Sequence, residues 1–243
     1  MSGKITFTLD GRQVEALPGE TIWQVAQRQG TTIPHLCYAP EPGYRADGNC
    51  RACMVEIKGE RVLAASCIRK PVQDMVVNTA SDEATSARRM VMEMLVADQP
   101  ARESAPDPES KFWAWADAMG VTDSRFPARE RMASDSSHVA IAVNLDACIH
   151  CNLCVRACRE VQVNDVIGMA YRGHGAKIVF DFDDPMGDST CVACGECVQA
   201  CPTGALMEAN LLDKAGTRRE FEDRHVDTLC PYCGVGCQTR VYV

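Results

Sequence analysis

The sequence predicts an α+β chain of several small domains, and three observations support this prediction. Near the N-terminus, two short stretches of alternating apolar and polar residues flank a helix-forming segment, which is typical of a small sheet crossed by one helix. A longer helical stripe follows between residues 81 and 99. The second half then holds two copies of one cysteine motif, separated by thirty-two residues.

The composition points to metal sites and excludes several kinds of partner. The 243 residues include fifteen cysteines and carry a net charge of −8. Reducing compartments disfavour disulfides, so this cysteine content in a chain without a secretory start predicts bound metal. The lack of a basic run argues against a nucleic-acid partner, and no window approaches the roughly eighteen apolar residues of a membrane span. We expect a cytoplasmic protein that does not contact the membrane.

The N-terminal elements predict a ubiquitin-like β-grasp, the scaffold of plant-type ferredoxins. Asp10-Gly11 is a strong hairpin turn, and Thr21 is a good helix cap. A second hairpin is expected around Lys58-Gly59. The predicted strands are Lys4 to Leu9, Arg12 to Ala16, Met54 to Ile57 and Val62 to Ala65, with a helix from Thr21 to about Gln29.

The repeated motif predicts two [4Fe–4S] clusters in a bacterial-type ferredoxin domain. Both copies have the spacing C-x2-C-x2-C-x3-C, and the second is followed by proline. The first three cysteines of such a motif surround one cube, and the fourth points away to ligate the other cube. Structural or zinc-binding cysteines are the alternative, but zinc usually takes separated pairs. The expected ligand sets are Cys148, Cys151, Cys154 and Cys201 for one cluster, and Cys158, Cys191, Cys194 and Cys197 for the other.

Four earlier cysteines form a different pattern. Cys37, Cys50, Cys53 and Cys67 have the spacing C-x12-C-x2-C-x13-C, which departs from the plant-type pattern. It resembles the N-terminal [2Fe–2S] domain of the large iron–sulfur subunit of respiratory complex I and of related NAD-linked hydrogenases and formate dehydrogenases. The resemblance implies that these cysteines hold one [2Fe–2S] cluster, with small residues of segment 44–52 close to its sulfurs. A structural zinc site is the alternative.

The connecting region is predicted to be helical and to carry no cluster. Its second helix, Glu109 to Met119, holds aromatic residues that we expect to serve packing and not electron relay. The families named above have one histidine and three cysteines here for a further [4Fe–4S] cluster, but residues 68–147 contain no cysteine and only His138 as histidine. His150 is expected to shield a cluster and not to ligate it. The first helix, Ser81 to Gln99, has an expected apolar stripe of Ala84, Ala87, Met90, Val91, Met94 and Leu95.

The last cysteines form an incomplete motif. The segment C-P-Y-C-G-V-G-C contains Cys230, Cys233 and Cys237 and resembles the opening of molybdenum- or tungsten-bis(pterin) enzymes of the formate dehydrogenase type. In that family a later cysteine completes a [4Fe–4S] cluster, whereas this sequence ends six residues after Cys237. We therefore expect a portion of a longer polypeptide.

The order of these modules resembles the N-terminal part of the α subunit of soluble NAD-dependent formate dehydrogenases. The resemblance implies an oxidoreductase module that carries electrons between a Mo/W-pterin formate site and a flavin- and NAD-binding partner, with a small [2Fe–2S] subunit in the same complex. The Mo/W-bis(pterin), FMN and NAD would lie outside this chain, which offers no catalytic residue. The alternative is the iron–sulfur subunit of an NAD-reducing hydrogenase or another complex-I-like oxidoreductase. The expected domains are 1–78 ([2Fe–2S] β-grasp), 79–138 (helical), 139–210 (paired [4Fe–4S]) and 211–243 (linker and start of the catalytic domain).

Overall fold

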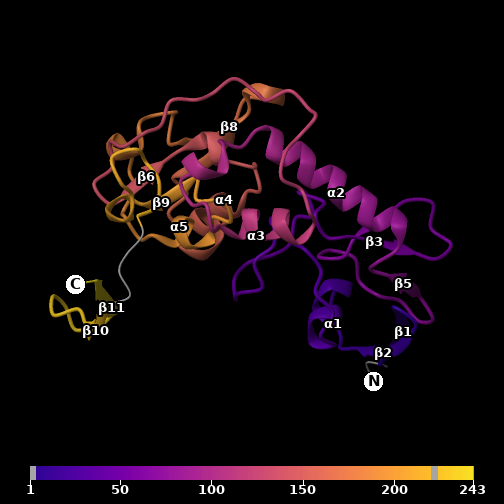
Figure 1. Cartoon of the computed structure of the whole chain (residues 1–243). Coiled ribbons are helices and arrows are strands. Elements are labelled where there is room, and N and C mark those ends of the chain that lie inside the picture. The colour runs from indigo at the N-terminus through magenta and orange to yellow at the C-terminus, as the bar shows by residue number, and fades with distance from the viewer. Residues whose placement is uncertain (1–3, 220–223, 243) are drawn as a thin grey trace.

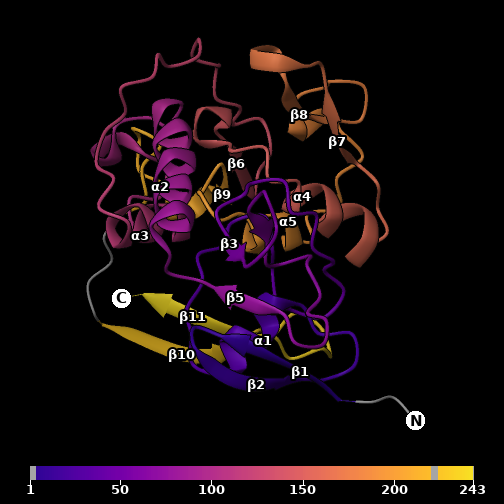
Figure 2. The same cartoon turned by 90° about the vertical axis from the view of Figure 1, so that its right-hand side faces the viewer.

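The computed structural model describes residues 4–219 and 224–242. It contains an N-terminal sheet, a helical region, a second region of short strands and helices, and a C-terminal hairpin. In Figure 1 the N-terminal sheet lies at the lower right and the second region at the upper left, with the helical region between them; Figure 2 shows the same arrangement from the side.

The N-terminal sheet has five strands in the order β2-β1-β5-β3-β4. Strands β1 and β5 are parallel, and the remaining pairs are antiparallel. This is the mixed α/β arrangement that the hairpins predict, but the sequence patterns did not predict β5. The expected strand 62–65 is shorter in the structure, because only Ala64 and Ala65 pair with β3. The elements are β1 (Ile5–Leu9), β2 (Arg12–Ala16), α1 (Ile22–Arg28), β3 (Met54–Ile57), β4 (Ala64–Ala65) and β5 (Val76–Asn78).

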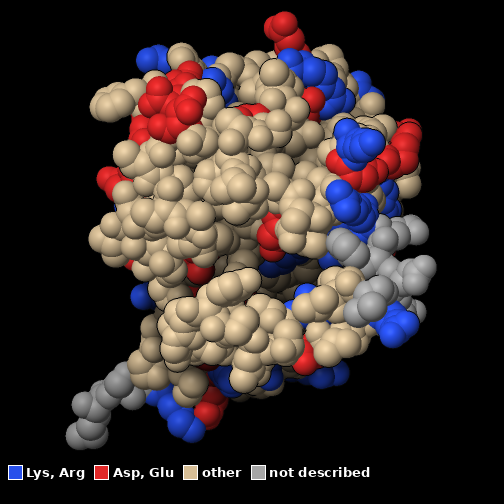
Figure 3. Space-filling model, turned by 90° about the vertical axis from the view of Figure 1, so that its left-hand side faces the viewer, with Lys and Arg blue, Asp and Glu red and all other residues tan. Residues whose placement is uncertain are grey.

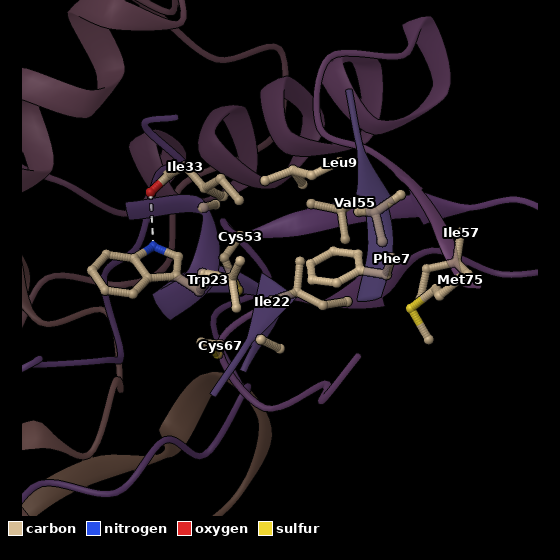
Figure 4. Close-up of a cluster of buried hydrophobic side chains, with 14 of the residues drawn as sticks. Phe7, Leu9, Ile22, Trp23, Ile33, Cys53, Val55, Ile57, Cys67 and Met75 are labelled. Carbon is tan, nitrogen blue, oxygen red and sulfur yellow. Dashed lines mark hydrogen bonds between the residues drawn. The ribbon is translucent and has the colours of Figure 1, made fainter. Parts of the chain in front are cut away.

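The inner face of this sheet and helix α1 form one apolar core (Figure 4). Alternation along β1 turns Phe7 and Leu9 inward, where they meet Ile22 at the start of α1. The helix starts at Thr21, whose side chain accepts from the backbone N–H of Gln24 while the Gln24 side chain accepts in return. Cys53 and Cys67 belong to the same core, so the fold fixes two of the predicted ligands directly.

Helix α2 (Asp82–Ala97) buries only part of the expected stripe: Ala84 is buried and Ala87, Val91 and Leu95 are half-buried. Met90 and Met94 are 38% and 46% exposed, whereas Met92 is fully buried. The expected stripe is therefore wrong at these two methionines. The buried face packs on the aromatic side of α3 (Lys111–Ala118), where Phe112 and Trp113 are buried. The aromatic residues serve packing, as predicted.

The second region consists of two strand pairs and two short helices. Strand β6 (Ile141–Val143) pairs with β9 (Leu206–Glu208), and β7 (Ile167–Ala170) pairs with β8 (Lys177–Phe180), both antiparallel. Helix α4 (Leu153–Arg156) continues into a π-helical turn at Ala157–Val161, a distortion that is common at functional sites. Helix α5 (Glu196–Ala200) follows the second cysteine motif. Short 3-10 turns lie at Arg102–Ser104, Leu145–Ala147, Gly173–Gly175, Met186–Asp188 and Ala209–Leu211.

The C-terminal hairpin joins β10 (His225–Leu229) to β11 (Gln238–Tyr242), and every residue of both strands is exposed. Figure 3 shows it as a separate lobe below a broad face with few charged side chains at its centre. Residues 220–223 of the expected linker lie outside the described residues. No helix in the described part of the chain is long and apolar enough to cross a membrane.

Candidate iron–sulfur sites

The N-terminal site consists of Cys37, Cys50, Cys53 and Cys67; the first three lie in the connection between α1 and β3, and Cys67 lies in the connection between β4 and β5. The backbone N–H of Cys37 donates to Cys50 Sγ, and the N–H of Cys50 donates to Cys37 Sγ, both at 3.4 Å. Hydrogen bonds from the thiols of Cys50 and Cys67 lower the pKa of Cys37 to about 2, and the bond to Cys37 raises the pKa of Cys67. Four sulfur atoms in mutual reach, three of them on buried residues, form a donor set that suits a cationic iron–sulfur core.

A glycine, Gly48, allows two loops of the N-terminal site to pack closely. Gly48 has φ +64°, and a Cβ at this position would lie 2.8 Å from Ile68 Cδ1, next to Cys67. Glycine therefore lets the loop that leads to Cys50 approach the loop that carries Cys67. The sequence predicted that small residues of this segment lie close to the cluster sulfurs, whereas the close contact of Gly48 is with the side chain of Ile68.

The first paired site consists of Cys148, Cys151, Cys154 and Cys201. They line one enclosed cavity together with apolar side chains that include Leu145, Ile178 and Leu206. Burial raises the pKa of Cys148 to about 11 and raises the pKa values of Cys151 and Cys154 as well. Thiolates here need a bound cation to compensate the burial, and the cavity has the sulfur ligands that an iron–sulfur cube requires.

The second paired site consists of Cys158, Cys191, Cys194 and Cys197, which line a second enclosed cavity with Ile141, Val166 and Ile167. Cys158 comes from the π-helical turn after α4, whereas the other three come from the loop before α5 and from α5 itself. Burial raises the pKa of Cys197 to about 12. Each cavity is thus lined by three cysteines of one motif and the fourth cysteine of the other motif.

The two motifs share a backbone conformation that directs N–H groups at sulfur. His150 and Asn152 in the first motif, and Ala193 and Gly195 in the second, all have positive φ between 52° and 78°. The N–H groups of His150 and Ala193 each donate to the sulfur two residues earlier, at 3.4 Å. Such bonds stabilise sulfur ligands and tune a cluster. His150 lies in this loop with its ring beside Arg129, which fits the expected shielding role.

The three sites are neighbours in space. Cys37 of the N-terminal site and Cys151 of the first paired site lie in one buried cluster with Ala39 and Leu153. Both paired sites share another apolar cluster, to which Cys154 and Cys158 belong. The sites therefore follow one another in the order N-terminal, first paired, second paired.

Sequence reasoning missed the charged residues in these contacts. Arg129 and Arg156 are 5% and 2% exposed, and both donate to backbone carbonyls of cysteine ligands. Arg156 lies inside the first motif, but the cysteine spacing gives no signal for its partners. His138 accepts from the N–H groups of Ala140 and Ile141 and so stabilises the start of β6.

The C-terminal cysteines, Cys230, Cys233 and Cys237, occupy the loop between β10 and β11. Cys233 and Cys237 are exposed, and the N–H of Cys230 donates to the Cys237 carbonyl at 2.8 Å. In the described ranges, no group of three or more His, Cys, Asp or Glu side chains has the spacing for a single metal ion.

Comparisons with known proteins agree with this division of the chain. A family model described as a 2Fe-2S iron-sulfur cluster binding domain matches residues 2–82, and one described as a 4Fe-4S dicluster domain matches residues 147–205. The chain is 33% identical over 211 residues to the NADP-reducing hydrogenase subunit HndD of Solidesulfovibrio fructosivorans, which covers 84% of this chain and 36% of that protein. It is also 33% identical over 242 residues to an NADH-quinone oxidoreductase subunit of Rhizobium meliloti, with 98% of this chain and 27% of that protein covered.

The chain spans about a third of the length of these curated relatives. It covers most of one chain in a known crystal structure. In the crystal structure of an NAD+-reducing [NiFe]-hydrogenase in the H2-reduced state, one chain matches with a TM-score of 0.75 and 30% identity, covering 88% of this chain and 92% of that chain. A Staphylococcus aureus protein whose name assigns it only provisionally to the formate dehydrogenases is 24% identical over 280 residues, covering 100% of this chain and 28% of that protein.

Proposed function

Because the chain belongs to the family of iron–sulfur modules that includes the matched NADH-quinone oxidoreductase subunit and the matched chain of an NAD+-reducing [NiFe]-hydrogenase, we propose that it conducts electrons between an NAD-linked partner and a second redox centre. The observation that carries this proposal is the serial contact of the three cysteine sites. Cys37 meets Cys151 in one buried cluster, and Cys154 meets Cys158 in the next. An electron on any site then has a neighbour to move to.

The proposed ligands are the three complete cysteine sets. The N-terminal site would hold a [2Fe–2S] cluster, and each paired site a [4Fe–4S] cluster; when bound, these groups supply one-electron redox chemistry. The protein contributes apolar burial, which excludes water, and N–H groups aimed at Cys37, Cys148 and Cys191, which stabilise negative charge on sulfur. Cys158 also accepts from the N–H of Val166 at 3.3 Å.

The test is the iron and acid-labile sulfide content of the anaerobically purified chain. The three sites predict about 10 irons per chain, or about 14 if the C-terminal cysteines hold a further cube with an outside ligand. Zinc in place of iron would overturn the proposal.

A separate experiment tests whether each paired site takes its fourth cysteine from the other motif. Replacing Cys158 with Ser should damage the second paired site and leave the N-terminal site intact, because Cys158 lines the cavity of Cys191, Cys194 and Cys197. The matched control is Cys237→Ser in the exposed hairpin loop. Loss of the first paired site with survival of the second would refute the crossed ligand sets.

We further propose that the second redox centre is a Mo/W-bis(pterin) formate site and that the chain serves an NAD-dependent formate dehydrogenase. The segment 230–237 supports this proposal because its C-P-Y-C-G-V-G-C pattern resembles the opening of such catalytic domains. The weak match to the Staphylococcus aureus protein along the whole chain points the same way. The partners would be the catalytic domain, a flavin- and NAD-binding iron–sulfur subunit and a small [2Fe–2S] subunit.

An NAD-reducing hydrogenase is the second candidate, favoured by the TM-score of 0.75 to a chain of such an enzyme; the 33% identity to HndD, a subunit of an NADP-reducing hydrogenase, favours a hydrogenase more generally. The two candidates separate when the intact complex is purified through a tag on this chain. Formate-dependent NAD reduction together with bound molybdenum or tungsten supports the first candidate. Hydrogen-dependent NAD reduction together with bound nickel supports the second.

A further inference from the structure

Arg129 is a buried cation at the loop of the first paired site. Its guanidinium Nη2 donates to the backbone carbonyls of Leu145, of Asp146 at 3.3 Å and of Cys148 at 3.2 Å. Nη1 lies 3.3 Å from His150 Nε2. Within residues 4–219 and 224–242, no carboxylate lies within 4.0 Å of the Arg129 guanidinium, and its Nε has no hydrogen-bond partner.

Arg156 is a second buried cation, and it joins the first paired site to the N-terminal site. Its Nη2 donates to the Cys37 carbonyl at 2.7 Å and to the Cys151 carbonyl at 3.3 Å. Its other terminal nitrogen, Nη1, pairs with Asp47 at 2.8 Å. The guanidinium of Arg156 therefore bridges the two cysteine loops, and Asp47 neutralises part of its charge, whereas Arg129 has no carboxylate partner.

The second paired site has no such cation. In the part of the chain that the structure describes, no Arg or Lys side chain donates to the backbone of residues 191–197. The neighbouring Arg159 is exposed and pairs with Asp165 at 2.6 Å, so solvent and a carboxylate screen its charge. The two paired sites thus have matching sulfur ligands and different charges around them.

A buried charge without a counter-charge is strongly unfavourable. Four thiolates around an iron–sulfur core give a site net negative charge, and this charge grows when the site accepts an electron. We propose that Arg129 is the main counter-cation of the first paired site, that Arg156 adds a smaller contribution because it shares its charge with Asp47, and that together they raise the reduction potential of this site above that of the second. The inference rests on the proposed function. The added electron would then reside on the site that touches the N-terminal site.

The experiment is a redox titration of the full chain, followed by electron paramagnetic resonance (EPR). The Cys158→Ser variant lacks the second paired site, so its remaining [4Fe–4S] signal identifies the first. In the unaltered chain the first site should be reduced at the higher potential. Arg129→Gln should lower the potential of that site alone, with at least a tenfold change in its oxidised-to-reduced ratio, which is about 59 mV for one electron. Arg129→Lys retains the charge and should restore most of the shift.

The control variant is Arg159→Gln, which removes an exposed cation next to Cys158 and should leave both potentials unchanged. If Arg129→Gln loses iron, the comparison of Arg156→Gln with Arg156→Lys decides; the expected shift has the same direction and is smaller, because Asp47 already neutralises part of the Arg156 charge. Equal shifts of both paired sites, or no shift in a chain with about 10 irons, would overturn the inference and leave the proposed function standing. A chain without iron would instead remove the proposed function.

Discussion

The hairpins β1–β2 and β10–β11 each join two five-residue strands in a continuous antiparallel register, yet their surroundings differ completely. In the first hairpin, Phe7, Leu9, Val14 and Ala16 are buried against helix α1. In the second hairpin, all ten strand residues are exposed. Since a lone two-stranded hairpin is marginally stable in water, the difference lies in the packing partners and not in the strand pairing.

The cysteines follow the same division. The N-terminal hairpin belongs to a domain with a complete set of four cysteines, three of which are buried. The loop of the C-terminal hairpin carries three cysteines, two of which are exposed. Burial restricts how many ways the ligands can be arranged and keeps water away from sulfur, so of these two regions we expect a preformed site in the N-terminal domain and not in the C-terminal hairpin.

The largest contrast should come from removing one cysteine in each region. Cys53→Ala should remove the N-terminal cluster, about two irons per chain, because Cys53 is a buried member of the set of four. Cys233→Ala should leave the iron content unchanged. Iron and sulfide analysis with EPR spectra measures both. A loss of about four irons in Cys233→Ala would show that the C-terminal cysteines hold a further cube.

The next largest difference should come from removing one apolar side chain in each hairpin. Phe7 is 1% exposed, so Phe7→Ala should reduce the local unfolding free energy of β1 by about 3–5 kcal/mol. Val226 is 56% exposed in the C-terminal hairpin, and Val226→Ala should change stability by less than about 0.5 kcal/mol. Native-state hydrogen exchange of the strand amides measures each region separately. A large effect of Val226→Ala would mean that the hairpin packs on another surface in solution.

The sequence predicted the elements with strong local signals and missed those that depend on distant partners. The Asp10-Gly11 turn, the Thr21 cap and the cysteine spacing are local, and each has its expected structure. The spacing of each motif also explains why its first three cysteines line one cavity, whereas the approach of the fourth cysteine from the other motif depends on the tertiary fold. Strand β5 has three residues and no pattern of its own, so its parallel pairing with β1 could not be predicted.

The buried faces and the buried charges depend on tertiary contacts. Helical periodicity is compatible with several apolar faces of α2, and packing on α3 selects the face with Met92 over the one with Met90 and Met94. Arg156 meets Cys37, 119 residues earlier in the chain, and no local pattern encodes this contact.

The helix cap at Thr21 should have a smaller effect on stability. It stabilises α1, the helix on which the N-terminal hairpin packs. The Thr21 side chain accepts from the Gln24 N–H, so Thr21→Ala should cost about 1 kcal/mol in the local stability of the N-terminal domain. Ser110 precedes α3 without a capping hydrogen bond, which makes Ser110→Ala a matched control with a smaller expected effect. Hydrogen exchange in α1 and α3 compares the two. Equal losses would show that side-chain capping does not explain the effect at Thr21.

The smallest expected effect is the pH response of the exposed hairpin. Arg240 donates to both carboxylate oxygens of Asp227 across the strands, at 2.7 and 3.1 Å, and this hydrogen bonding lowers the pKa of Asp227 below its usual 3.8. Since the folded pKa lies below the unfolded one, the pair supports the hairpin at neutral pH, and its contribution is lost as the pH falls below 3.8 through the folded pKa. Amide exchange in β10 should therefore accelerate slightly in acid relative to the unfolded chain. Asp227→Asn should abolish this dependence, and an unchanged acid response in that variant would assign it to another group.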